Sequence, residues 1–545
     1  MGIIGLLFLL FTLPLQQAPL KGVIWSMPAS RKQAKVDLLR MHLAGVEAIR
    51  TGVITDEQIL RWTDSLGFKV FQDLPIYGVA GERLEDTLAF AQRVLGQMLE
   101  RAHRHPSARY FGLAVYSNTR SAKGYTYFKA LTEYVHEQGP EGSQTYYVTF
   151  FTAPEAVASA VDMVLLERLD SPAPLADWKQ FYVTHGEVAS GISVGTYVDE
   201  FQRRGYRLPH TAEYQARYLE RILKALLVQE REIPPSVLWV YRWRDQAYKS
   251  AQSCVPDALL SRAYGLHDLT SQPRYAFYVM RGFFTGRQLT FAFASGQPAT
   301  FSVYDMLRLF ALIVLGMWGI MFKQFPLFHR LVRRYFGAHT FYQESLRRKE
   351  VASLAVHGVI TNLYGLAFAL VSFFLWVTFA SYGKAVRLLC PLGGPLREAW
   401  AVLLESSWYV FWIAWLIFLL GVGGIVGYVL LISRGKLRFR QALPLVIFPL
   451  WGMLFWLLVV ALVSSLPPER QYMWLPWIVW GIAGTGVWAG IRMGLDLAGV
   501  LHLPVGRSLL WLPGVGWGLV LIIGLLLYGY YAPEVRFIFY ILMNG

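Results

Sequence analysis

Residues 45–76, GVEAIRTGVITDEQILRWTDSLGFKVFQDLPI, contain a strand, a helix and a second strand in close succession. Residues 46–50 and 68–72 are short apolar runs, and residues 55–66 between them have a helical pattern. A helix between two short apolar strands is typical of a parallel strand pair. The stretch therefore predicts parallel β-structure in this part of the chain.

The same alternation continues on both sides of this stretch. The candidate strands are residues 22–27, 46–50, 68–72, 110–117, 145–151, 162–167, 179–184 and 236–243. Helical stretches lie between them, for example residues 34–44, 55–66, 83–104, 122–138 and 211–230. Eight strands alternating with helices predict an α/β domain, a (β/α)8 barrel over residues 20–295. In that fold the functional groups lie at the carboxyl ends of the strands.

The second half of the chain has a different composition. Of all 545 residues 55% are hydrophobic and only 16% are charged, and the mean hydropathy is +0.37. Runs of about 20 apolar residues can span a membrane. We expect an all-α polytopic membrane domain over residues 304–545, with about six spans: 304–323, 352–381, 402–432, 442–465, 473–491 and 509–532.

The charges of the loops predict the orientation of these spans. Residues 323–351, 433–441 and 492–507 hold thirteen Lys and Arg residues, whereas the alternate loops and the C-terminus hold five. Cytoplasmic loops carry the positive excess, so residues 20–300 and the C-terminus are predicted to be extracytoplasmic. Loop 323–351 is either an amphipathic helix on the inner leaflet or an ordinary cytoplasmic loop. A local ion pair with Arg492 is the expected role of Asp496.

The remaining composition excludes several classes of function. The net charge of +15 sits largely in membrane loops, and no basic helix with interleaved aromatics favours nucleic acid. Cys254 and Cys390 match no metal-binding spacing, so we expect neither a metal nor a cofactor. Residues 1–19 are an apolar segment, interpreted as an export signal. The alternative is an apolar segment packed on the barrel or in the membrane.

Several motifs then resemble one family in order and spacing. Residues 45–76 contain Arg50 at a strand end, DSLG at 64–67, and Asp73 at the next strand end. Residues 105–119, HPSARYFGLAVYSNT, place His-Pro-Ser before a strand. TAEYQARYLERIL (211–223), VLWVYRWRDQ (237–246) and RAYGLHDLTSQPRYAFYVM (262–280) follow. Together they resemble the barrel of glycoside hydrolase family 2, the β-galactosidase and β-glucuronidase group.

This resemblance implies a catalytic site that has lost its acids. Retaining glycosidases use two carboxylates ~5–5.5 Å apart. The family's acid/base is the Glu after Asn on strand four, where this chain has Thr119 after Asn118. The family's nucleophile is the Glu of a Glu-aromatic-Gly pattern on strand seven. We align this pattern with residues 183–191 of this chain, which places Thr184 at the position of the nucleophile. A rebuilt site using His185 and Glu187 is the competing interpretation.

The part of the site that binds the substrate is predicted to be retained. The residues expected to bind substrate are Arg50, Asp73, Asn118, Tyr147, Trp243 and Asp245. A structural role is the alternative, in which Asp73 and Asp245 pair with Arg50, Arg242 or Arg244 inside the barrel mouth.

Three functions follow as hypotheses for a multi-pass protein of the cytoplasmic membrane. The first is a pseudoenzyme whose barrel binds a glycan or an envelope protein partner, with the lipid bilayer around its spans. The second is an active hydrolase with a non-standard carboxylate pair. The third is a subunit of an envelope assembly or polysaccharide export complex. The spacing of the barrel-mouth carboxylates distinguishes the second hypothesis from the others.

Overall fold

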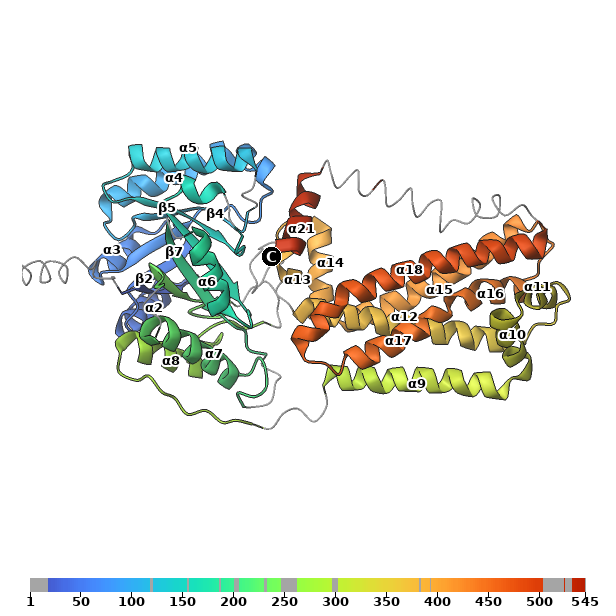
Figure 1. The fold of residues 1–545 in the computed structure, drawn as a ribbon. Helices are drawn as coiled ribbons and strands as arrows, with labels where there is room; N and C mark the ends of the chain where they lie inside the picture. The colour runs from blue at the N-terminus through green and yellow to red at the C-terminus, as the bar shows by residue number, and fades with distance from the viewer. Residues whose placement is uncertain are drawn as a thin grey trace, which may run out of the picture. The chain divides into compact units, whose positions relative to one another are not determined.

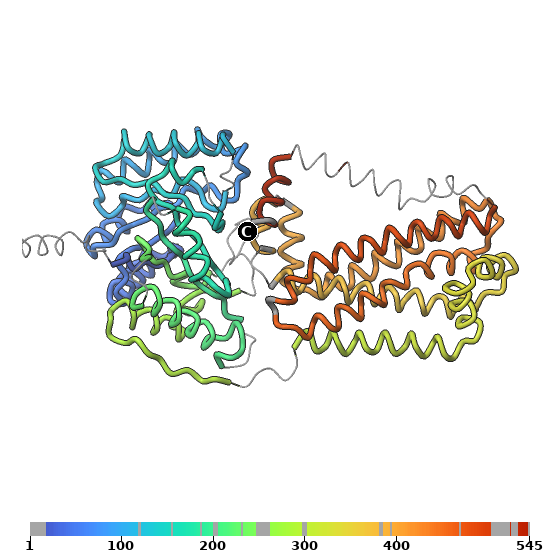
Figure 2. The backbone as a smooth tube through the Cα atoms, viewed as in Figure 1, coloured from blue at the N-terminus to red at the C-terminus, as the bar shows by residue number. Residues whose placement is uncertain are grey.

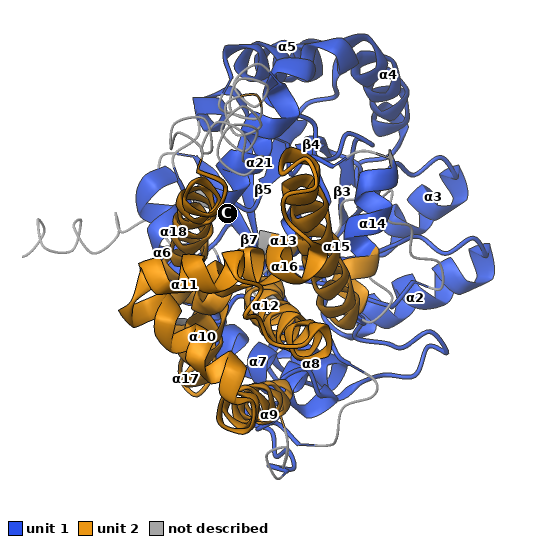
Figure 3. Cartoon of the chain, turned by 90° about the vertical axis from the view of Figure 1, so that its right-hand side faces the viewer, with its two compact units in different colours: residues 1–299, 386–401, 532–545 blue, residues 300–385, 402–531 orange. Residues whose placement is uncertain are grey.

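The computed structural model describes residues 18–544, apart from 118–120, 154–155, 186–187, 200–204, 230–232, 247–261, 297–301, 382–383, 393, 503–523 and 525–531. The chain divides into two compact units, coloured separately in Figure 3. Unit 1 comprises residues 1–299, 386–401 and 532–545, and unit 2 comprises residues 300–385 and 402–531.

Unit 1 contains a closed barrel of eight parallel strands in the order β1 to β8, as predicted (Figure 1). The strands are β1 Leu20–Ile24, β2 Ala48–Gly52, β3 Lys69–Asp73, β4 Tyr110–Val115, β5 Gln144–Thr149, β6 Met163–Leu169, β7 Ala189–Gly195 and β8 Val237–Val240. The first strand pairs with the last, Gly22 with Trp239, which closes the sheet.

Helices surround the barrel. They are α2 Arg31–Leu43, α3 Glu57–Ser65, α4 Leu88–Arg104, α5 Ala122–Gln138, α6 Pro174–His185, α7 Ala212–Lys224 and α8 Tyr275–Thr285. Helix α3 illustrates why they form where they do. The Asp56 carboxylate accepts a hydrogen bond from the Gln58 backbone N–H at 3.0 Å and caps the helix. Ile59 and Leu60 then fall on the face that packs against the barrel.

The seventh strand is the one that the sequence misplaces. Residues 179–184, predicted to be a strand, belong to helix α6, and β7 lies at residues 189–195. Trp178 and Phe181 are apolar because they form the buried face of α6. The run therefore has the composition of a strand although its periodicity is that of a helix.

The true seventh strand, ASGISVG, carries a weak apolar signal because its glycines are required by packing. A Cβ on Gly191 would lie 2.5 Å from a Val237 methyl carbon, and a Cβ on Gly195 would lie 2.5 Å from the Tyr241 carbonyl oxygen. Strand β8 approaches β7 too closely at these positions for any side chain. The contacts that explain these glycines are tertiary.

Among its described residues, unit 2 contains five helices that are long and apolar enough to cross a membrane: Val303–Gln324, Leu354–Ala380, Trp408–Ile432, Phe439–Val463 and Arg470–Leu501. They correspond to the first five predicted spans. In Figure 2 the backbone tube shows α9 (Val303–Gln324), α12 (Leu354–Ser381) and α15 (Trp408–Ile432) as long helices. Helix α12 contacts both α9 and α15. The predicted sixth span, 509–532, falls almost entirely outside the described residues.

The predicted cytoplasmic loop 323–351 is folded into unit 2 as two helices, α10 Pro326–Gly337 and α11 His339–Arg347. Their apolar faces, with Phe328, Leu331 and Tyr342, belong to the core of this unit. The expected pair of Asp496 with Arg492 is not what forms. His339 of α11 pairs with the fully buried Asp496 of α18 (Pro468–Leu501), and the Arg492 guanidinium lies 5.6 Å from the centre of the Tyr335 ring.

Two segments distant in sequence complete unit 1. Helix α21, Pro533–Asn544, is held by ion pairs of Glu534 with Arg83 at 2.6 Å and of Arg536 with Glu82 at 3.3 Å. In residues 386–401, the Arg387 guanidinium lies 4.8 Å from the centre of the Phe150 ring. Both segments thus join the barrel in one compact unit.

Candidate functional site

A buried arginine lies at the centre of the barrel mouth. Arg50, on β2, pairs through Nη2 with the Asp73 carboxylate at 2.9 Å and through Nη1 with the Glu167 carboxylate at 3.1 Å. Asp73 ends β3, and Glu167 lies in the second half of β6. These residues are 4%, 7% and 3% exposed. One guanidinium therefore holds two buried carboxylates that come from opposite parts of the barrel.

Two tyrosines also donate hydrogen bonds to these carboxylates. Tyr146 donates its hydroxyl to Asp73 Oδ1 at 2.7 Å, and Tyr116 donates its hydroxyl to Glu167 Oε1. Tyr116 adopts a left-handed backbone with a φ of 55°, a conformation that costs ~1–3 kcal/mol for a bulky residue. Gly112 makes room for the cluster, since a Cβ there would lie 2.7 Å from Asp73 Oδ1.

The electrostatics of the cluster follow from burial and pairing. Burial acts against the charge of Arg50, but the carboxylates of Asp73 and Glu167 outweigh it and raise the Arg50 pKa above its usual range. Burial raises the pKa of Glu167, and the attraction of Arg50 counteracts only part of this effect. Burial lowers the pKa of the neighbouring Arg242. Glu167 is therefore a carboxyl whose burial favours the protonated form.

A cavity of about 370 Å³ opens onto this cluster. This size falls within the ~300–1,000 Å³ range of small-molecule sites. Arg50, Asp73 and Glu167 line it together with Arg242, so two cations and two carboxyl groups face the same space. The remaining lining includes aromatic side chains, among them Trp25, Tyr77 and Tyr116. The arrangement is suited to an uncharged ligand with many hydroxyl groups and an apolar ring face.

The structure brings together only part of the predicted site. Arg50 and Asp73 meet at the cavity, paired as the structural alternative expected. The predicted site residues Asn118, Thr119 and Glu187 lie outside the described residues. The role of Arg50 and Asp73 in binding substrate stays a prediction.

Tyr147, Trp243 and Asp245 are not among the described residues that line this cavity, and their role in binding substrate stays a prediction. Side chains alternate along a strand, so Tyr146 faces the barrel interior and Tyr147 packs outward on Phe128, with ring centres 5.4 Å apart. Trp243 packs on His267 with ring centres 4.5 Å apart.

Asp245 is engaged elsewhere. Its carboxylate pairs with Arg274 at 2.7 Å and accepts a hydrogen bond from the Gly265 N–H at 2.7 Å. It therefore joins the chain after β8 to the segment that leads into α8, while Arg244 pairs with Asp37.

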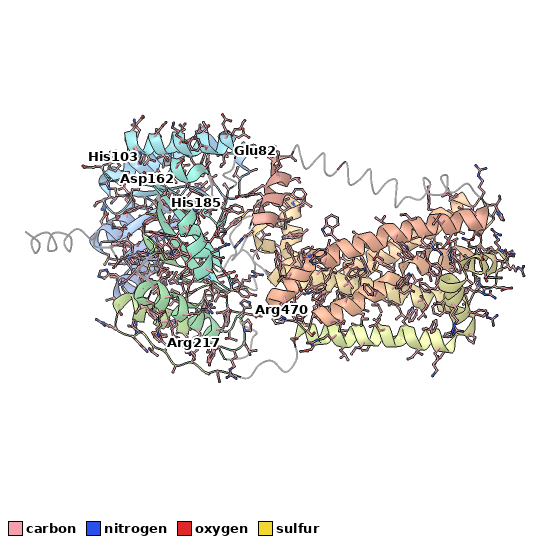
Figure 4. The ribbon with its side chains drawn as sticks, viewed as in Figure 1. Glu82, His103, Asp162, His185, Arg217 and Arg470 are labelled. Carbon is pink, nitrogen blue, oxygen red and sulfur yellow. The ribbon has the colours of Figure 1, made fainter. Side chains whose placement is uncertain are left out.

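Thr184 and His185 lie in the last turn of α6, before β7 begins, and not at the carboxyl end of a strand. His185 is labelled in Figure 4. Thr184 is exposed and donates to the Gln180 carbonyl. His185 is buried, its Nδ1 lies 3.1 Å from the Phe181 carbonyl oxygen, and its ring stacks on Phe181. This corrects both assignments, because they rested on reading α6 as strand seven.

The residues that do follow β7 were missed by the sequence analysis. Thr196 comes directly after β7 and is followed by Tyr197. The Thr196 hydroxyl donates to Asp170 Oδ1 at 2.9 Å, and the Tyr197 N–H donates to the same oxygen at 3.2 Å. The feature of the sequence that could have identified this strand end is the Thr-Tyr pair that follows ASGISVG. The end of strand seven thus carries a threonine, although not the one that was predicted.

No family model and no curated protein matches this chain. Similar solved structures include a GH2 β-galacturonidase from Eisenbergiella tayi bound to galacturonate, with 16% identity and a TM-score of 0.43 over 51% of this chain and 52% of that one. A Faecalibacterium prausnitzii β-glucuronidase has 16% identity and a TM-score of 0.43 over 51% and 50% of the two chains. A Bifidobacterium dentium β-glucuronidase complexed with coumarin-3-O-glucuronide has 15% identity and a TM-score of 0.43 over 50% and 47%. This chain spans about half the length of these proteins, and the similarity concerns the fold alone.

Proposed function

We propose that this chain is a membrane-anchored, extracytoplasmic barrel protein that binds a glycan at the barrel mouth and does not cleave it. The observation that carries the proposal is the sharing of Arg50 by Asp73 and Glu167 next to a 370 Å³ cavity. The cavity provides room and an aromatic lining, while its carboxyl groups are already engaged.

The chemistry of glycoside cleavage supports the second part of the proposal. A retaining enzyme needs one carboxylic acid that gives up its proton and one carboxylate that attacks the sugar. Asp73 and Glu167 each accept hydrogen bonds from Arg50 and from a tyrosine. Either role would require breaking these bonds inside a buried site, where an unpaired charge is costly.

The proposed extracytoplasmic location of the barrel rests on the loop charges and on which segments of the chain belong to unit 1. Residues 386–401 and 532–545, predicted to be extracytoplasmic from their flanking charges, belong to the same compact unit as the barrel. Five apolar helices supply the membrane anchor. All three segments of unit 1 are therefore assigned to one side of the membrane.

Binding is tested with the full chain in detergent against a panel of neutral oligosaccharides, using isothermal titration calorimetry. Tyr77 lines the cavity and is 38% exposed, and an aromatic ring at such a position can contact a sugar. Tyr77→Ala is expected to weaken binding ~10-fold, which corresponds to ~1.4 kcal/mol. The matched control is Tyr275→Ala, an exposed tyrosine on α8 that does not line the cavity. Equal affinities in both variants contradict the proposed site.

Catalysis is tested in parallel with chromogenic aryl β-glycosides. We expect no turnover above background. The competing function is a hydrolase with a non-standard carboxylate pair, and one observation favours it: Asp73 and Glu167 line the same cavity. Turnover by the wild type that disappears in Glu167→Gln would establish that hydrolase and overturn the proposal.

A further inference from the structure

A second cavity, of about 310 Å³, lies along helix α7 and shares no lining residue with the barrel-mouth cavity. Its helical lining falls at positions 214, 217, 218, 220, 221 and 224, and residues three and four apart lie on one face of a helix. The aromatic members are Tyr206, Tyr214 and Tyr218, and the cationic members are Arg217, Arg221 and Lys224.

The loop before the helix contributes the remaining described lining residue, Tyr206, and this loop is held by the chain after α8. The Tyr206 N–H donates to the Ala294 carbonyl at 3.0 Å, which joins the loop before α7 to the segment after α8. Gly205 has a φ of 120°, and a Cβ there would lie 2.3 Å from the Gly296 Cα. The two backbone segments therefore approach each other closely beside Tyr206.

The charge of the cavity is unbalanced. Among its described lining residues Glu220 is the one acid, and it faces three cations. The Glu220 carboxylate accepts from Arg217 at 2.6 Å and from the Phe291 N–H at 3.3 Å, and the residue is buried. Arg221 and Lys224 are exposed and belong to no ion pair among the described residues. An excess of two positive charges thus attracts an anion.

The aromatic side chains add a surface for a ring. The Arg217 guanidinium lies 5.1 Å from the centre of the Tyr206 ring and 5.7 Å from that of Phe293, so it is held by cation–π contacts. Burial raises the pKa of Tyr214 and of Tyr218, so both phenols remain neutral donors and acceptors. Arg217 lies on α7 in Figure 4.

We propose that this cavity binds an acidic sugar, a pyranose ring that carries a carboxylate or a phosphate. The ring would stack on Tyr214, which is half-buried, and the anion would pair with Arg221 and Lys224. Carboxylate and phosphate share the geometry that a guanidinium recognises. The site goes beyond the proposed glycan binding at the barrel mouth, where two cations and two carboxyl groups balance.

The test is isothermal titration of the full chain in detergent with D-glucuronate and with glucose 6-phosphate. Glucose lacks the anion, and inorganic phosphate lacks the ring. The variant is Arg221→Gln/Lys224→Gln. Its control is Lys32→Gln/Arg93→Gln, which removes two exposed cations from α2 and α4 and so changes the net charge equally.

Acidic sugars are expected to bind the wild type and the control, and to bind the variant at least ~10-fold more weakly. Equal affinity in variant and control overturns the proposal. So does inorganic phosphate that binds as tightly as glucose 6-phosphate, because the ring would then contribute nothing. Tyr77→Ala, at the barrel mouth, should leave acidic-sugar affinity unchanged, which separates failure of this site from failure of the other.

Discussion

Arg50 and Glu167 are 117 positions apart in the sequence, yet their side chains pair at 3.1 Å inside the barrel mouth. The same guanidinium pairs with Asp73, so one cation compensates two buried carboxyl groups. A buried pair of this kind contributes little net stability when intact, but losing one partner is costly because a charge is left uncompensated.

Arg50→Met is therefore expected to destabilise the barrel by ~3–5 kcal/mol. Denaturant unfolding of the full chain in detergent, followed by tryptophan fluorescence, measures this change. The control is Arg61→Met, whose pair with Glu57 is exposed and is worth no more than ~1 kcal/mol. A difference of less than ~1 kcal/mol between the two variants would show that the cluster is solvated and not buried.

Acid is expected to destabilise the barrel through His267. Burial lowers the pKa of this residue below its usual 6.5 while its ring packs on Trp243 and Phe277. Between that folded-state pKa and 6.5 the unfolded chain binds more protons, so stability falls as the pH falls, by at most ~1.4 kcal/mol per pH unit.

His267→Gln removes this titration. The variant should lose less stability than the wild type between pH 7 and pH 5, even if it is less stable at pH 7. Thermal melts across this range check the slope. The control is His103→Gln, which replaces an exposed histidine of α4. Parallel pH profiles for the wild type and His267→Gln count against the prediction.

Unit 2 contains a comparable pair in His339 and Asp496. Asp496 is fully buried, so His339→Ala should destabilise unit 2 by ~3–5 kcal/mol. Adding Asp496→Asn to His339→Ala should recover much of the loss, because the amide leaves no uncompensated charge. Thermal stability in detergent measures both variants. A double variant as unstable as the single one would show that packing, and not charge, connects α11 to α18.

The charge asymmetry of the loops predicts that residues 323–351 are cytoplasmic and that residues 386–401 are extracytoplasmic. Single cysteines at the exposed positions Arg348 and Glu398, placed in a chain without its own two cysteines, test this with a membrane-impermeant maleimide. In intact cells Glu398→Cys should react and Arg348→Cys should react only after lysis. Labelling of Arg348→Cys from outside reverses the assignment.

Much of the fold follows from local pattern. Seven of the eight strands and five of the described helices in unit 2 coincide with runs whose length and composition are sufficient to identify them. The pairing of Arg50 with Asp73 was also open to prediction, because adjacent parallel strands carry these residues at their ends. Local periodicity and the alternation of strands and helices determine these features without knowledge of the rest of the chain.

The tertiary structure alone decided the remainder. Strand β7 is glycine-rich because β8 crowds it, so its apolar signal is weak and α6 was read in its place. Glu167 faces Arg50, Tyr146 faces inward while Tyr147 faces outward, and His339 reaches Asp496 across 157 positions. Closure of the barrel and packing of the bundle bring these side chains together. Sequence by itself determined the elements, whereas the contacts among distant side chains depend on how those elements close on one another.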